Sequence, residues 1–425
     1  MVIAFATFFL GLTVGLHPVE LDVAPGVVRV ELHLDGELAH TLEGAPWGTE
    51  LDFGDELRPR HLEALAFDAE GAEVSRIEQW VNLPHPPAAI TVALDEHVPG
   101  KPRNALIRWE TTTGNDPKSI RVSFDGKPLR FKGQGVQLPP HDLSSLHFLR
   151  VELDFGGGVE PVKELAFGGT YGDQVSTELT ALPILVEKGQ EAPTVESLQG
   201  LLTARGETLR VTAVEQGESN VVLLTNRPYR APFEPQGMTL RHYARLPKDM
   251  TVNVLTTAPT RFEGVRASFM RFPMTRKLSR EDGGLYFLAS RLRADPVQKK
   301  KQRLGEAVAV AGLNAFQGGN RRAVVMILSR DLPDYELHPA YARRYLEHLH
   351  IPLHIWVPDT KPHPDHEVWG EARSISTIQL FKEAAEDLFE SMEQQWIVWL
   401  DGNHLPQEIE LAPNADGLSL VGPSS

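Results

Sequence analysis

The chain of 425 residues contains no cysteine. This absence excludes disulfide bonds, a cysteine nucleophile and thiolate-ligated zinc or iron–sulfur clusters. Basic residues are also in deficit, because 42 Lys and Arg stand against 57 Asp and Glu, which gives a net charge of -15. Binding to nucleic acid needs a basic surface that displaces counterions from phosphates, so we expect no nucleic-acid partner. With 41% hydrophobic and 23% charged residues, the composition is that of a folded protein.

Long apolar runs are scarce, and the main one is at the amino terminus. Residues 1–16 (MVIAFATFFLGLTVGL) are apolar, but they lack the Lys or Arg that begins a signal peptide and are shorter than a membrane span. Three interpretations are open: a signal peptide whose charged start is missing from this chain, a short anchor, or a first buried strand. We favour the remnant of an export signal that runs into a strand. The expectation is an exported protein, periplasmic or at the cell surface, with a cytoplasmic location as the alternative.

Residues 17–83 and 88–168 are predicted to form two β-sandwich modules. In the first, a stretch that alternates apolar and polar residues ends at Asp35-Gly36, a hairpin turn, and Asp125-Gly126 repeats this arrangement in the second. The second module therefore reads as a divergent copy of the first. The motif Leu-Asp-Phe-Gly also occurs twice, with an offset of 102 residues instead of the 90 between the Asp-Gly pairs. An insertion in the second copy, around residues 133–145, would explain the difference.

Residues 217–425 are predicted to form an α/β domain. Residues 303–316 carry apolar side chains at helical spacing, and a second helix begins near Pro339. Each helix precedes an apolar run of strand length, Arg321–Leu328 and Ile351–Val357. Helix, strand, helix and strand with short links are typical of a parallel sheet covered by helices.

The boundaries of this domain come from weaker signals. Residues 169–216 look like a mixed connector, and the buried-type strand Asn220–Thr225 follows it. Ser376 with Gln379 predicts a capping box for a last helix, and residues 396–400 (WIVWL) read as the closing strand of the sheet.

Ligands of a doubly wound domain bind at the carboxyl ends of its parallel strands. Here the first strand ends in Thr225–Arg230 and the central strand in Ser329–Asp331. At this point the sequence resembles the bacterial proteins described as VWFA-related, which carry a von Willebrand factor type A domain behind β-sandwich modules. The stretches that carry the resemblance are VRVELHLDG through LDFGDELRPRHLEALAFDAEG, VNLPHPP, FGGTYGDQVSTELTALP, LGEAVAVAGLNAFQGGNRRAVVMILS, YARRYLEHLHIPLHIWV and IVWLDGNHLPQEI.

The resemblance implies a Rossmann-like sheet and a metal-ion-dependent adhesion site at the strand tips. That site uses a D-x-S-x-S loop, a Thr and a later Asp, whose oxygens suit Mg²⁺. This chain departs from the pattern, because the loop has Asn226 in place of the first Asp, Pro and Arg replace the two Ser, residues 304–306 supply no Thr, and Arg330 occupies the place of the later Asp. We therefore expect a degenerate site without metal or cofactor. The candidate residues for binding a protein partner, through a basic pocket that accepts an acidic side chain, are Asn226, Arg227, Tyr229, Arg230, Arg330 and Asp331.

Histidines give the remaining candidates. His363 and His366, beside Glu367, could ligate zinc, but a helical H-E-x-x-H motif is absent and neighbouring prolines favour a solvated loop, which we prefer. His354 is expected to be a hydrogen-bonded core residue, and His404 beside Asp401 a turn residue. The leading hypothesis is a non-enzymatic, exported interaction protein that binds a protein partner. The alternatives are a metal-dependent hydrolase that uses the loop with His363 and His366, and a structural spacer in an extracytoplasmic assembly.

Overall fold

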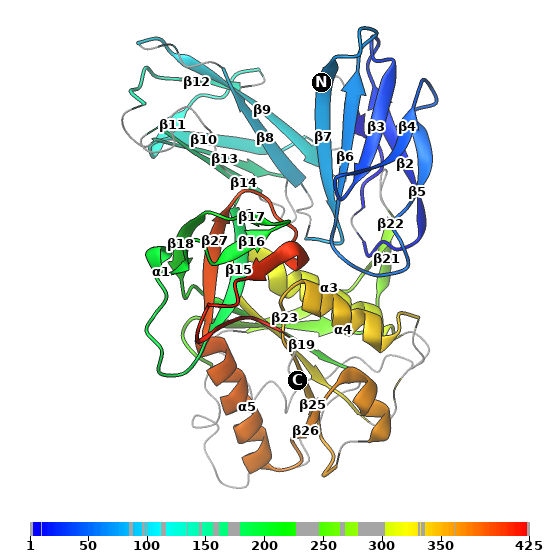
Figure 1. Cartoon of the computed structure of the whole chain (residues 1–425), viewed down its shortest axis with the longest axis vertical. Helices are drawn as coiled ribbons and strands as arrows, with labels where there is room; N and C mark the ends of the chain where they lie inside the picture. The colour runs from blue at the N-terminus through cyan, green and yellow to red at the C-terminus, as the bar shows by residue number, and fades with distance from the viewer. Residues whose placement is uncertain are drawn as a thin grey trace.

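The computed structural model describes residues 3–9, 11–84, 88–95, 98, 100–111, 116–133, 135–143, 147–155, 161–168, 179–226, 246–263, 268–278, 302–329, 332, 336–361 and 363–422. The structure is mostly β, with 46% strand and 17% helix. Two β-sandwiches, a mostly parallel sheet covered by helices, and a third β unit make up the molecule (Figure 1). None of the described helices is both long and apolar enough to cross a bilayer.

The first β-sandwich is built from seven strands, three in one sheet and four in the other. Ile3 and Phe5 belong to its core and are 1% and 7% exposed, so the apolar start of the chain forms a buried strand ahead of the predicted boundary at residue 17. One sheet has the strand order β1 (Ile3–Phe5), β2 (Leu16–Val23), β5 (Gly48–Asp52). The other has the order β4 (Glu37–Leu42), β3 (Arg29–Leu34), β6 (Arg60–Phe67), β7 (Glu73–Val81).

The second β-sandwich repeats this arrangement strand for strand, as the sequence predicted for a duplicated module. Its core is separate from that of the first and includes Val122, Leu149 and Val151. One sheet has the strand order β8 (Ala88–Leu94), β9 (Arg103–Thr111), β12 (Gly135–Leu138). The other has the order β11 (Lys127–Leu129), β10 (Ser119–Phe124), β13 (His147–Asp154), β14 (Val162–Phe167).

Hydrogen bonds at the two Asp-Gly turns fix the register between the copies. Asp35 exchanges two bonds with His61, whose backbone N–H donates to Asp35 Oδ1 at 2.9 Å and whose carbonyl accepts from Asp35 N at 2.7 Å. Asp125 makes the same pair of bonds with Phe148, each at 2.8 Å. His61 and Phe148 therefore occupy equivalent positions in the two sandwiches. They are 87 residues apart, whereas the two Asp-Gly turns are 90 apart, so the second copy is shorter than the first between its turn and this strand. The prediction of an insertion is wrong, because the Leu-Asp pairs that begin the two motifs lie on strands that are not equivalent, β5 and β13.

The mostly parallel sheet follows the sandwiches in sequence. The predicted helices and strands between residues 303 and 357 are confirmed, and β24 pairs with β25 in parallel. Helices α3 (Leu304–Phe316) and α4 (Pro339–His348) pack on one face, and α5 (Ile378–Glu393) packs on the other. The N-cap of α5 is Thr377, whose hydroxyl accepts from Leu380 N, instead of the predicted Ser376. The strand order is β23 (Met274–Leu278), β20 (Met250–Thr256), β19 (Ser219–Thr225), β24 (Arg321–Ile327), β25 (Leu353–Val357), β26 (Ala372–Ser374), and β23 alone of these six is antiparallel to its neighbour.

The third β unit combines residues on both sides of the parallel sheet in sequence. Strand β27 was predicted to close the parallel sheet, which is wrong, because it lies antiparallel between β15 and β18. An apolar run indicates that a strand is buried but not which strand it pairs with. Residues 179–216 of the predicted connector thus belong to a folded unit that also includes residues near the carboxyl terminus. Its elements are β15 (Leu179–Val186), α1 (Val195–Leu198), β16 (Leu202–Ala204), β17 (Glu207–Thr208), β18 (Val211–Glu215), β27 (Gln395–Asp401), β28 (Ile409–Leu411) and β29 (Leu418–Leu420).

The first sandwich packs against the helices of the parallel sheet. Leu57, from the loop before β6, is 1% exposed and belongs to the core formed by α3 and α4. Nearby, the hydroxyl of Tyr345 on α4 donates to the backbone carbonyl of Asn82, and the Asn82 side chain in turn bonds the backbone of Thr13 and Arg58. These contacts hold the lower end of the sandwich on the helical layer (Figure 1).

Candidate functional site

The carboxyl ends of β19 and β24 meet through Asn226. This residue is 1% exposed, and its side-chain oxygen accepts from the backbone N–H of Ser329 at 2.9 Å. Asn226 replaces the first Asp of the adhesion-site motif, and its side-chain oxygen forms a hydrogen bond within the protein. The other predicted partner-binding residues, Arg227, Tyr229, Arg230, Arg330 and Asp331, lie outside the described residues.

The loop with His363 and His366 forms the short 3-10 helix η6 (Pro364–Trp369). His366 is fully buried; its Nδ1 accepts from His363 N and its Nε2 donates to the carbonyl of Ser329, both at 3.3 Å. Burial lowers the pKa of the His366 imidazole. Because both ring nitrogens bond to the backbone, His366 has no lone pair to offer a metal. Of the two histidines predicted as possible zinc ligands, His366 therefore has a structural role.

His354 was predicted to be a hydrogen-bonded core residue. It does lie in the sheet, but one of its ring nitrogens makes no hydrogen bond within the described residues. It lies on β25, and its Nε2 is buried with no hydrogen-bond partner in the described part of the chain. Burial lowers its pKa to about 4, and the nearby positive charge of Arg373 adds to the shift. His354 is therefore a neutral residue of the sheet.

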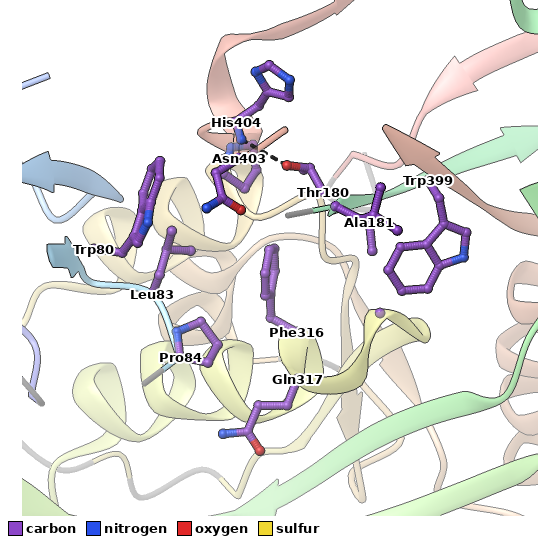
Figure 2. A pocket seen from close by; sticks show the side chains of 13 residues that line it. Trp80, Leu83, Pro84, Thr180, Ala181, Phe316, Gln317, Trp399, Asn403 and His404 are labelled. Atoms are coloured by element: carbon purple, nitrogen blue, oxygen red, sulfur yellow. Dashed lines mark hydrogen bonds between the residues drawn. The ribbon is translucent and has the colours of Figure 1, made fainter. Parts of the chain in front are cut away.

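A pocket of about 810 Å³ lies where the first sandwich, the third β unit and the end of α3 come together (Figure 2). Volumes of this size are typical of ligand sites, which form preferentially at junctions between domains. Sequence patterns could not reveal it, because its walls come from four distant parts of the chain. The lining residues are Trp80, Leu83, Pro84, Leu179, Thr180, Ala181, Phe316, Gln317, Gly319, Trp399, Asn403, His404 and Pro406.

Three aromatic rings of this pocket are each held by a contact behind them. Trp80 stacks on His61 with ring centroids 4.2 Å apart. Phe316 lies under the guanidinium of Arg322, whose Cζ is 4.1 Å from the ring centroid. The indole N–H of Trp399 donates to a carboxylate oxygen of Glu215 at 2.8 Å. The rings are therefore positioned before any ligand arrives, which reduces the ordering cost of binding.

The described part of the pocket lining has no carboxylate, lysine or arginine. Thr180 Oγ1 accepts from the backbone N–H of His404 at 2.8 Å (Figure 2). The same hydroxyl donates to the carbonyl of Gly402, also at 2.8 Å. His404 Nε2 bonds the backbone carbonyl of Asp401 at 2.8 Å, and His404 lies in the short link after β27. Gln317 and Asn403 are exposed and present amide groups. Among the described lining residues His404 is the one titratable side chain, so this part of the pocket lacks the paired groups that acid–base catalysis uses.

Arg322 places a positive charge behind the aromatic wall. It is 1% exposed, and its Nη2 donates to the carbonyl of Ala181 at 3.3 Å, while Nε and Nη1 have no partner in the described part of the chain. Burial lowers its pKa to about 9. The sequence marks this position only as a basic residue at the start of a buried strand, an unusual place for a charge.

Neither protein-family models nor curated proteins match this chain. Among solved structures, it is similar to the central fibronectin-III array of RIM-binding protein, with 12% identity over 47% of this chain and 83% of that one, at a TM-score of 0.27. It is also similar to the fibronectin(III)-like modules of Clostridium thermocellum CbhA, with 11% identity over 39% of this chain and 93% of that one, at a TM-score of 0.17. At these TM-scores the similarity says nothing about function. The immunoglobulin- or fibronectin-III-like form of the two sandwiches follows from their own strand orders.

Proposed function

We propose that this protein is a non-enzymatic interaction protein, in which two β-sandwich modules and a von Willebrand factor type A-like domain bind a protein partner outside the cytoplasm. The aromatic pocket is the binding site that the described residues support best. Its preformed rings suit an aromatic or proline side chain of a partner segment, because such side chains dock in aromatic-lined grooves. The observation that carries this proposal is that the described lining around Trp80, Phe316 and Trp399 has no carboxylate, lysine or arginine.

The type A-like assignment is supported by the strand order. In sequence order, β19 is the first strand of the sheet and β24 the fourth, so the spatial order reads 3-2-1-4-5-6. This is a common order of Rossmann-like, doubly wound domains, and their ligands bind where the order reverses. That point lies between β19 and β24, where Asn226 meets Ser329. The strand-tip face is therefore a second candidate surface. Arg227, Arg230 and Arg330, which the sequence predicts as its basic residues, lie outside the described residues.

A displayed peptide library tests the pocket. Gln317→Trp places a bulky ring in the mouth of the pocket, and Gln379→Trp, at an exposed glutamine on α5, is the matched control. Peptides selected on the wild-type protein should carry an aromatic residue or proline. They should bind Gln317→Trp at least about tenfold more weakly, which corresponds to 1.4 kcal/mol, and bind the control unchanged. Selected peptides that bind both variants with wild-type affinity would refute the pocket as the site.

Magnesium tests the degenerate site at the strand tips. A ligand that binds the native state raises the melting temperature by mass action, so the wild-type protein should show no rise with Mg²⁺. A clear rise that Asn226→Ala abolishes would contradict the proposal and restore an adhesion-type metal site. The hydrolase hypothesis is disfavoured by the two backbone bonds of His366.

A further inference from the structure

A histidine and two glutamates converge on the outer face of the first sandwich, and none of the three lines the pocket. His61 and Glu63 alternate along β6, and Glu78 stands on the neighbouring strand β7. One ligand atom from each of the three lies within 4.8 Å of the others. His61 Nε2 is 2.8 Å from Glu78 Oε2, and His61 Nδ1 is 3.9 Å from Glu63 Oε2. Within the described residues this is the one place where three possible ligands meet so closely.

Two of these carboxylates oppose each other directly. Glu63 and Glu78 are cross-strand partners in the β6–β7 pairing, a placement in which like charges destabilise a sheet. Arg76 offsets part of this repulsion at 3.4 Å from Glu63, but it makes two closer bonds, 3.0 and 3.1 Å, to Glu73 and its side chain is 54% exposed. A cation between the two glutamates would remove the remaining repulsion.

The second sandwich supplies an internal comparison. Because His61 is equivalent to Phe148, the positions of Glu63 and Glu78 correspond to Arg150 and Glu164, which are also cross-strand partners. At these positions the copy has a phenylalanine, an arginine and a glutamate, where the first sandwich has a histidine and two glutamates. The fold itself does not require the His-Glu-Glu set.

Trp80 positions the histidine. It is the cross-strand partner of His61, and the two rings stack with an angle of 19° between their planes. This contact restricts rotation of the imidazole, and supporting contacts of this kind orient metal ligands. The equivalent pair in the second sandwich is Phe148 and Ala166.

We propose that His61, Glu63 and Glu78 bind a divalent transition-metal cation, with Zn²⁺ as the best match. One imidazole nitrogen and two carboxylate oxygens form a ligand set that Zn²⁺ accepts, with water in the open position, whereas Mg²⁺ and Ca²⁺ prefer oxygen ligands alone. Since Trp80 contacts His61 on one side and lines the aromatic pocket on the other, bound metal would also fix one wall of that pocket. The metal site itself does not depend on the proposed function.

Calorimetric titration of the full chain with Zn²⁺ tests this site. Other histidines among the 16 in the chain can bind zinc weakly, so the comparison between variants decides the outcome. Glu78→Gln and Glu63→Gln should each weaken the tightest site by more than about tenfold. Glu164→Gln, at the equivalent position of the second sandwich, should leave it unchanged, and Mg²⁺ should not compete.

Tryptophan fluorescence gives an independent readout. Zn²⁺ should change the emission of the wild-type protein, and Glu78→Gln should lose most of that change, because it keeps every tryptophan and alters only the proposed metal site. Circular dichroism and melting temperature establish that each variant is folded. Equal zinc affinity in the wild-type protein, Glu78→Gln and Glu63→Gln would overturn the proposal, as would tight binding that only Glu164→Gln weakens.

Discussion

Gly319 is the position where one added methyl group should disturb the aromatic pocket most. It follows the end of α3 in the left-handed region, with φ of +63°, and lines the pocket beside Trp399. A Cβ at this position would lie 2.4 Å from Cη2 and 2.9 Å from Cζ2 of the Trp399 indole, and 3.1 Å from the Cβ of Ala181. Since ordinary contacts begin near 3.4 Å, the indole would have to move by about 1 Å.

The expected loss of stability for Gly319→Ala has two parts. A left-handed backbone costs a residue with a Cβ about 1–2 kcal/mol. Overpacking against Trp399 adds about 1–3 kcal/mol, since the displaced indole also loses its hydrogen bond to Glu215. The free energy of unfolding should therefore fall by about 2–5 kcal/mol. Gly217→Ala is the matched control, because Gly217 has φ of +58° and a Cβ there would meet nothing within 4 Å.

Urea unfolding followed by circular dichroism and tryptophan fluorescence measures both variants. Gly217→Ala should lose only the backbone part, and Gly319→Ala should lose about 1–3 kcal/mol more. The near-ultraviolet spectrum of Gly319→Ala should also change, because the indole moves. If the two variants were equally stable and their spectra matched the wild type, the packing of Trp399 against Gly319 would be refuted.

Three further substitutions probe the packing and the charge state of the parallel sheet. Gly305→Ala should destabilise by about 3 kcal/mol in urea unfolding, because its Cβ would lie 2.1 Å from the backbone carbonyl oxygen of Leu337, which cannot move aside cheaply; wild-type stability would refute the close approach. Tyr345→Phe leaves the buried carbonyl of Asn82 without its donor and should cost about 1–2 kcal/mol and speed proteolysis near residue 82; an unchanged proteolysis rate would count against that contact. For His354, the folded pKa of about 4 lies below the ordinary 6.5, so the unfolded chain binds the extra proton and stability falls as the pH drops from 6.5 towards 4, by on the order of 2–3 kcal/mol. His354→Leu should flatten that part of the stability–pH curve, and an unaltered slope would show that another group is responsible.

Local patterns of the sequence determine the individual elements. The helical spacing of residues 304–316 predicts α3, and the apolar run at residues 321–327 predicts β24. Both predictions succeed because a buried helix face or a strand buried on both faces produces a pattern among residues close in sequence. The turns at Asp35 and Asp125 follow in the same way, since an Asp-Gly pair accepts the left-handed backbone of a tight hairpin. The duplication of the sandwich was visible from these turns alone.

Tertiary structure alone decided how distant segments combine. The same apolar pattern fits β27 in either of two sheets, and its pairing with β15, more than 200 residues earlier in the chain, depends on which partner is free in three dimensions. The pocket and the His61, Glu63 and Glu78 cluster have the same origin. In each, strand register or domain packing brings together side chains that are separated in sequence. The spacing of residues along the chain does not predict such contacts.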